Sequence, residues 1–293
     1  MDIVDNVELV LDAQTELGEG PVWDPVASCL YFVDILRGRV HRYDPASHDT
    51  RVYEVDRMVG AVAPSEAGDL MLAVHDGFAR MDLSTGRVQM VAAVEADRPD
   101  QRMNDGKCDP AGRFWAGTMA IDERGGAGSL YRLDPDGRVH TMLGHVSISN
   151  GLDWSDDGRT MYFIDSPTQS VDLFDFDLPT GAIANRRSLV RVGGVHGMPD
   201  GLTLDVDGCV WVTLWGGGEV RRYARNGSLA ASVRLPTAYP TSCIFGGPDL
   251  RDLYITTATI KLSDEDRAGQ PSAGGLFRAR PGPAGRAPNR FKG

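Results

Sequence analysis

Short apolar segments that alternate with polar turns are the dominant pattern along the chain. Six of these segments resemble one another, because each combines aliphatic and aromatic residues and most end at Asp or Thr. They are CLYFVD (29–34), DLMLAV (69–74), RFWAGT (113–118), TMYFID (160–165), CVWVT (209–213) and DLYITT (252–257). Segments of this length, bounded by Asp, Gly and Pro, indicate β-strands.

Each segment belongs to a larger unit that recurs six times. The unit begins with a small or polar residue and a first apolar strand, turns into the segment just described, and continues to a third strand such as LYRLD (130–134). Aligning the first strands makes six positions equivalent, separated by 41, 44, 46, 50 and 42 residues: Glu19, Gly60, Asn104, Asn150, Asp200 and Ser242. No amphipathic helical pattern fits between the strands, which disfavours an α/β fold.

Repeats of this length, built from three or four short strands, are typical of propeller blades. The pattern therefore predicts an all-β fold, a six-bladed β-propeller with four-stranded antiparallel blades, as a single domain over residues 1–280. The alternating segment 7–11 is expected to be an N-terminal strand that closes the last blade, whose other strands are expected at about 242–280. Residues 281–293 are rich in Pro and Gly and basic, and are expected to form a flexible tail.

Composition narrows the classes of function. The chain has 293 residues, 35 of them glycine, which agrees with many turns. Its net charge of −11 disfavours a nucleic-acid partner. The sequence contains no run of 18 apolar residues, which disfavours a membrane partner. Four cysteines without C-x-x-C spacing lie in apolar runs and are expected to be buried free thiols. The acidic N-terminus lacks the basic start of a signal peptide, so we expect a cytoplasmic protein; no pattern indicates an oligomeric state.

The aligned positions carry the candidate chemistry. In a propeller the first strand of each blade lies innermost, so Glu19, Asn104, Asn150 and Asp200 are expected to converge on the central channel. Two carboxylates and two amides are costly to bury unless they are satisfied, and a divalent cation would neutralise the carboxylates. Donors that are all oxygen favour Ca²⁺, Mg²⁺ or Mn²⁺ over Zn²⁺. The alternative is that these side chains bond only to backbone groups and channel water.

Several motifs resemble those of the senescence marker protein (regucalcin)/gluconolactonase family. They are LGEGPVW (17–23), RMNDGKCDPAGR (102–113), AGTM (116–119), ISNGLDWS (148–155), PDG (199–201), CIFGG (243–247) and AGGLF (273–277). They occur in the family's order over about 260 residues. The resemblance implies a six-bladed propeller that acts as a lactonase.

The resemblance also implies roles for particular residues. The glutamate of the first motif, the asparagine of S-N-G and the aspartate of P-D-G bind one divalent metal in that family, which gives this role to Glu19, Asn150 and Asp200. The ion implied is Ca²⁺, Mn²⁺, Zn²⁺ or Mg²⁺. Asp200 is also the candidate catalytic residue. It either accepts a proton from the attacking water or only binds the metal and orients that water, and the sequence leaves both roles open.

The expected substrate contacts come from two other stretches. The R-x-N-D-G motif implies that Arg102 and Asn104 bind the substrate. The family often has an acidic residue after the G-T-M motif that contacts sugar hydroxyls, and here Asp122 is the first match and Glu123 the second, in a short loop.

The activity implied is metal-dependent hydrolysis of sugar lactones, such as glucono-, xylono- or arabinono-lactone, to aldonic acids. One alternative on the same fold is an esterase- or phosphotriesterase-like hydrolase, for which we expect an apolar pocket mouth. Here Arg102, Asn104 and an acidic loop predict a polar mouth instead. The other alternative is a non-catalytic calcium-binding regulatory propeller, which has no need for polar residues in register on the axis.

Overall fold

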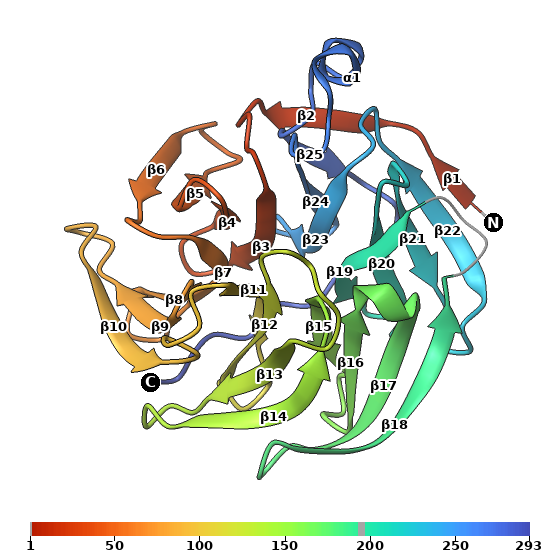
Figure 1. The fold of residues 1–293 in the computed structure, drawn as a ribbon. Coiled ribbons are helices and arrows are strands. Elements are labelled where there is room, and N and C mark those ends of the chain that lie inside the picture. Colours follow the sequence, from red (N-terminus) through yellow and green to blue (C-terminus); the bar gives the residue numbers. More distant parts are fainter. Residues whose placement is uncertain (1, 193–196) are drawn as a thin grey trace.

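Six β-sheets stand around a central axis in the computed structural model, which describes residues 2–192 and 197–293 (Figure 1). Blade 1 consists of β3 (Gly18–Asp24), β4 (Cys29–Asp34), β5 (Arg39–Tyr43) and β6 (Thr50–Glu54). Blade 2 consists of β7 (Val59–Pro64), β8 (Leu70–Val74), β9 (Gly77–Met81) and β10 (Val88–Ala93). Blade 3 consists of β11 (Gln101–Cys108), β12 (Phe114–Ala120), β13 (Gly128–Leu133) and β14 (Val139–Val146). Blade 4 consists of β15 (Ser149–Trp154), β16 (Thr160–Asp165), β17 (Ser170–Asp177) and β18 (Ala182–Arg191). Blade 5 contains β19 (Met198–Leu204), β20 (Val210–Trp215), β21 (Glu219–Tyr223) and β22 (Leu229–Arg234). Blade 6 contains β23 (Pro240–Gly246), β24 (Asp252–Thr257) and β25 (Leu276–Ala279), and each of these two blades gains one more strand from the N-terminal segment.

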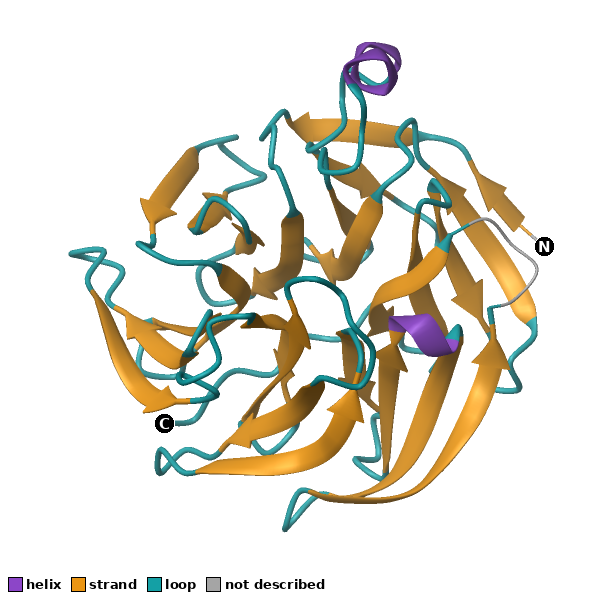
Figure 2. Ribbon diagram, in the orientation of Figure 1, coloured by secondary structure: helices purple, strands orange, loops and turns teal. Residues whose placement is uncertain are grey.

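The predicted six-bladed propeller is confirmed. Within each blade, consecutive strands pair antiparallel, and the first strands β3, β7, β11, β15, β19 and β23 contact one another in a closed circle. These innermost strands are buried along almost their whole length, whereas the outermost strands β6, β10 and β18 are mostly exposed. Two short helices complete the fold: η1 (Ser166–Thr168) after β16, and α1 (Asp264–Gly269), which stands outside the circle of strands (Figure 2). No helix in the described part of the chain is long and apolar enough to span a bilayer.

The N-terminal segment joins the two last blades. The strand β2 (Val7–Leu11) pairs antiparallel with β25, so the expected closure of the last blade by an N-terminal strand is confirmed. A further strand that was not predicted, β1 (Asp2–Val4), pairs in parallel with β22 and gives blade 5 a fifth strand. One N-terminal segment therefore holds blades 5 and 6 together.

The core lies between neighbouring blades, because each twisted sheet packs one apolar face against the next. Trp115 of blade 3 packs against Trp154 of blade 4 with ring centroids 5.7 Å apart. Trp211 of blade 5 meets Phe245 of blade 6 at the same distance, edge to face. All four cysteines are free and buried, as predicted.

The C-terminal segment differs from the expected loose tail. It crosses the propeller on the far side of the view in Figure 1, and its main chain forms bridges with blade 5 at Gly285 and with blade 2 at Phe291. The Phe291 side chain is only 1 % exposed. Arg286 donates to the carbonyl of Trp154 at 2.6 Å, and the Lys292 amide donates to the carbonyl of Gly112 at 3.0 Å. The segment lies against the blades through the buried Phe291 ring and the Arg286 guanidinium group, contacts that the composition of residues 281–293 did not indicate.

Candidate functional site

The six aligned positions share a local irregularity in the innermost strands. In every blade, the pairing between the first and second strands shifts register at or directly after the aligned residue. Such a bulge bends the strand and redirects a side chain. We call the six aligned residues, Glu19, Gly60, Asn104, Asn150, Asp200 and Ser242, the polar layer.

Glycines beside the polar layer allow the blades to approach closely. A Cβ atom added to Gly201 would lie 2.1 Å from Oγ of Ser242 in the next blade. One added to Gly151 would lie 2.5 Å from the amide nitrogen of Leu202. The glycines after Asn150 and Asp200 are therefore needed for a narrow channel that brings the polar layer together.

A cavity of about 280 Å³ opens at one end of the channel and contains most of the predicted site. Glu19, Asn104, Asn150 and Asp200 all line it and are 4–6 % exposed. Oε2 of Glu19 accepts a hydrogen bond from the amide of the adjacent residue at 2.8 Å. In residues 2–192 and 197–293, neither Glu19 nor Asp200 has a cationic side chain within 4.0 Å.

Burial of these carboxylates dominates the electrostatics of the site. Desolvation raises the pKa of Glu19 well above its ordinary value, and the charges of Asp200 and Asp105 raise it further. Desolvation likewise raises the pKa of Asp200, with Asp105 as the second cause. Arg102 lowers the pKa of both acids only in part, and its own pKa falls to about 10, chiefly because it is buried. Among the residues that the structure describes, no cationic side chain contacts either acid, and a divalent cation would supply the missing positive charge.

The amides of the polar layer are held by a chain of hydrogen bonds. Nδ2 of Asn104 donates to Oδ1 of Asn150 at 3.1 Å, and Nδ2 of Asn150 donates to Oγ of Ser166 at 2.7 Å. Ser166 in turn donates to the carbonyl of Pro199 at 2.7 Å. Because its nitrogen faces Ser166, Asn150 is left with its oxygen as the group available to a cation. Ser166 was not among the predicted site residues, although Pro167 directly after it marks a turn at the end of β16.

The donor set fits a divalent cation bound by oxygen. Glu19 and Asp200 offer carboxylates, and Asn150 offers an amide oxygen fixed by its neighbours. Within the described ranges, no group of three or more His, Cys, Asp or Glu side chains forms a metal site, so any cation here would depend on the amide oxygen. The metal-binding roles of the three residues stay a prediction.

The predicted substrate-binding residues divide into two groups. Arg102 and Asn104 line the cavity, and Nη1 of Arg102 donates to Oδ1 of Asn104 at 2.6 Å. Glu123 lies at the rim, where its carboxylate pairs with Lys261 at 3.1 Å. Asp122 does not line the cavity, since its 63 % exposed side chain pairs with Arg124. Of the two acids after the G-T-M motif, Glu123 is therefore the one that reaches the cavity.

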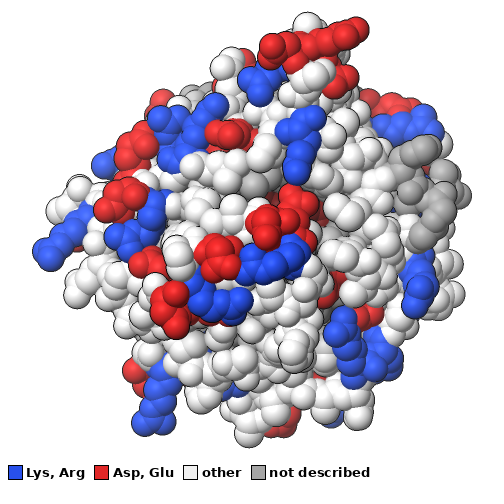
Figure 3. Space-filling model, in the orientation of Figure 1, with Lys and Arg blue, Asp and Glu red and all other residues white. Residues whose placement is uncertain are grey.

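The wall of the cavity toward its mouth is more apolar than the sequence analysis expected. It is lined by Leu17, Leu36, Met58, Met119, Ile121, Ile148, Met198, Trp215 and Ile260. On the same face of the molecule, acidic and basic side chains are grouped beside a broad area that carries neither (Figure 3). The apolar mouth that we associated with other hydrolases of this fold is thus present.

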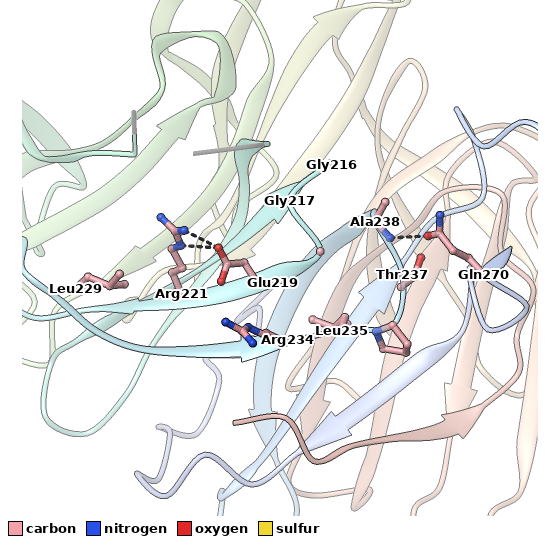
Figure 4. Close-up of a pocket in the computed structure, with 12 residues that line it drawn as sticks. Gly216, Gly217, Glu219, Arg221, Leu229, Arg234, Leu235, Thr237, Ala238 and Gln270 are labelled. Atoms are coloured by element: carbon pink, nitrogen blue, oxygen red, sulfur yellow. Dashed lines mark hydrogen bonds and ion pairs between the residues drawn. The ribbon is translucent and has the colours of Figure 1, made fainter. Parts of the chain in front are cut away.

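A second hollow, of about 660 Å³, lies away from the channel between the β20–β21 turn and the segment before β23 (Figure 4). Two pairs of its polar groups interact with each other, whereas the buried Oγ1 of Thr237 has no hydrogen-bond partner in the described part of the chain. Glu219 forms an ion pair with Arg221 at 2.6 Å, and Oε1 of Gln270 accepts from the amide of Ala238 at 2.6 Å. The run Gly216–Gly218 forms the turn between β20 and β21, and the hollow is lined by residues other than the polar layer.

Comparison with known proteins gives consistent matches over the whole chain. The family model described as "SMP-30/Gluconolactonase/LRE-like region" matches residues 17–259. Regucalcin of Xenopus laevis is 39 % identical over 295 residues, covering 98 % of each chain. The putative sugar lactone lactonase YvrE of Bacillus subtilis (strain 168) is 38 % identical over 290 residues, covering 98 % of this chain and 99 % of its own. The crystal structure of a calcium-binding protein, regucalcin, from Agrobacterium tumefaciens superposes with a TM-score of 0.96 at 30 % identity, covering 100 % of this chain and 99 % of that one.

Proposed function

The chain belongs to the SMP-30/gluconolactonase/LRE-like family, and from this membership we propose that it hydrolyses sugar lactones to aldonic acids with the help of one divalent cation. Glucono-, xylono- and arabinono-lactone are the first candidates. The observation that carries the proposal is the pair of buried carboxylates of Glu19 and Asp200 beside the oriented amide of Asn150 in one cavity, with no cationic side chain of residues 2–192 and 197–293 within 4.0 Å of either acid. The name of the Bacillus subtilis relative supports the reaction, and the calcium-binding description of the Agrobacterium tumefaciens structure supports the cation.

In this proposal Glu19, Asn150 and Asp200 hold Ca²⁺, Mn²⁺, Zn²⁺ or Mg²⁺, which supplies a Lewis acid for the lactone carbonyl. Arg102 lies beside Asn104 at the same cavity, so its free N–H groups can orient the lactone oxygens.

Asp200 is the candidate base. Water attacks the carbonyl carbon, the bond from that carbon to the ring oxygen breaks, and the proton taken from water ends on the ring oxygen as a hydroxyl group. Burial raises the pKa of Asp200 in the cation-free site, and a bound cation would lower this pKa again, because it stabilises the charged carboxylate that accepts the proton. In its other role, Asp200 only orients the water.

A second candidate function is favoured by the apolar mouth. An esterase- or phosphotriesterase-like hydrolase would use the same carboxylates and amide but would bind a less polar substrate. Ile121 shows the character of the mouth, since this cavity-lining side chain is 49 % exposed.

The decisive experiment compares substrate classes with and without cation. Protein stripped by a chelator is assayed for proton release on pentono- and hexonolactones, aryl esters and phosphotriesters, with each cation restored singly. We expect lactone hydrolysis that requires the cation and falls by orders of magnitude in Asp200→Asn. The matched control Asp136→Asn, in the exposed β13–β14 turn, should behave as wild type.

Three results would contradict the proposal. Lactone hydrolysis that is independent of cation removes the mechanism. Faster turnover of aryl esters or phosphotriesters than of any lactone establishes the second candidate. Cation binding, seen by calorimetry, without turnover of any substrate favours the calcium-binding regulatory propeller.

A further inference from the structure

The residues two positions before the polar layer form a second level of the channel. Side chains at i and i−2 of a strand point to the same face. We call these six residues the upper layer: Leu17, Met58, Arg102, Ile148, Met198 and Pro240. Five of the six line the cavity, all except Pro240, and Arg102 is the only one of the six that is charged. A group bound above the polar layer therefore meets mostly hydrocarbon and sulfur.

Loops around the mouth extend the same apolar surface. Leu36 comes from the β4–β5 turn, Ile121 from the loop after β12, Trp215 from the end of β20 and Ile260 from the segment after β24. Together with the upper layer, they give the cavity at least one apolar side chain from each of the six blades. Apolar side chains concentrated in this way around a cavity mark a site for an apolar ligand group.

The polar side chains at the same level are few and partly engaged, and the remaining N–H groups of Arg102 are those proposed to bind the lactone oxygens. Glu123 and Lys261 form an ion pair with each other across the rim. Nη1 of Arg102 donates to the carbonyl of Met103 at 3.1 Å and to Asn104. A hydroxyl group placed against Met58, Met198 or Ile148 would lose water without gaining a partner, whereas an alkyl group is favourably removed from water there.

We propose that the preferred substrate of this site is a lactone that carries an apolar substituent of several carbons. The lactone ring lies at the polar layer, and the substituent lies against Leu17, Met58, Ile148, Met198 and Trp215. This inference rests on the proposed lactone hydrolysis and narrows its substrate, because a fully hydroxylated sugar lactone leaves the upper layer without a matching partner.

The test measures kcat/KM with the cation present for gluconolactone and for a series of γ-butyrolactones with γ-substituents from hydrogen to hexyl. One methylene in an apolar pocket changes kcat/KM by roughly tenfold or more. We therefore expect the hexyl compound to exceed both the unsubstituted ring and gluconolactone by at least about tenfold. Met58→Gln and Met198→Gln, which keep side-chain length but add an amide, should reduce the gain from the substituent.

Val26→Gln is the matched control. Val26 is 75 % exposed in the β3–β4 turn, at the opposite end of the innermost strand from the cavity, so this variant should keep the wild-type dependence on chain length. Binding of the hexyl-substituted γ-lactam and of the unsubstituted γ-lactam, which resist hydrolysis, is measured by calorimetry as a readout that does not need turnover.

The outcomes separate this inference from the proposed function. Gluconolactone turned over as well as or better than the hexyl compound overturns the inference and leaves lactone hydrolysis intact. If no lactone is hydrolysed, the proposed function fails, and the lactams decide the inference alone. Tighter binding of the hexyl lactam then supports it, and equal or weaker binding overturns it.

Discussion

Replacing Phe291 by alanine tests whether the C-terminal segment is an integral part of the fold. The ring is 1 % exposed and packs in a cluster with residues of blades 2 and 3, including Phe114 and Met71. The Phe291 amide also donates to the carbonyl of Pro64 at 2.9 Å. Removing a buried Phe side chain costs about 3–5 kcal/mol in the free energy of unfolding. We expect about 3 kcal/mol, because the site is near the chain end and can collapse.

For a chain of 293 residues, with an unfolding entropy of roughly 2.1 cal/mol/K per residue, this loss corresponds to a fall in Tm of about 5 °C. It is measured by urea unfolding followed by tryptophan fluorescence and by thermal melting. Val52→Ala is the control, since Val52 lies on the outer strand β6 and is 45 % exposed, and its cost should stay within about 0.5 kcal/mol. If Phe291→Ala costs no more than this control, the segment is not docked and the reasoning is refuted.

The same perturbation has a consequence inside the channel. Pro288 and Asn289 of the C-terminal segment line a small pocket together with Asp105 and Lys107. Burial is the first cause of the raised pKa of Asp105. A segment that detaches would let water enter the channel from the side opposite the cavity, so Phe291→Ala should also lower the pKa of Asp105 toward its ordinary value, as followed by carboxyl NMR.

Three further predictions concern other groups. In cation-free protein, the pKa of Asp200 is raised first by burial and next by Asp105, so the folded state holds this proton more tightly than the unfolded chain. Its contribution to stability is therefore complete below the unfolded pKa of about 3.9 and is lost as pH rises through the higher folded value. Thermal melts of Asp200→Asn should thus decline less with rising pH than those of wild type, and parallel declines would refute this assignment. Ser166→Ala removes the group that orients Asn150 and should weaken Ca²⁺ binding about 10- to 100-fold by calorimetry, whereas unchanged affinity would show that Ser166 does not position the ligand. Burial raises the pKa of Cys243 to about 12, so its thiol should react with a disulfide reagent only when denaturant unfolds the protein, and rapid labelling of the native protein would contradict its burial.

The innermost strands show how far a local pattern can reach. The repeat and its register placed Glu19, Asn150 and Asp200 at equivalent positions, and the structure brings all three into one cavity. The residues two positions before the aligned residues form the mostly apolar upper layer. The sequence therefore already contained the pattern that predicts an apolar cavity wall, although we did not use it. Expecting a polar mouth from Arg102 and Asn104 overlooked their apolar neighbours.

Loops and chain ends were harder to place, because their partners are distant in sequence. Asp122 and Glu123 are adjacent, and only the loop conformation turns Glu123 toward Lys261 and Asp122 toward Arg124. Phe291 is buried in a groove that exists only after blades 2 and 3 have formed.

The sequence by itself determined the number of blades, the strands within them and the side chains that face the axis, since these follow from a six-fold repeat and a two-residue alternation. The tertiary structure decided which buried groups find partners. Closing the circle of blades places Asn104 of blade 3 against Asn150 of blade 4, but in the part of the chain that the structure describes it brings no cationic side chain within 4.0 Å of Glu19 or Asp200. The bond between the two amides joins residues of different blades, so no local pattern could specify it.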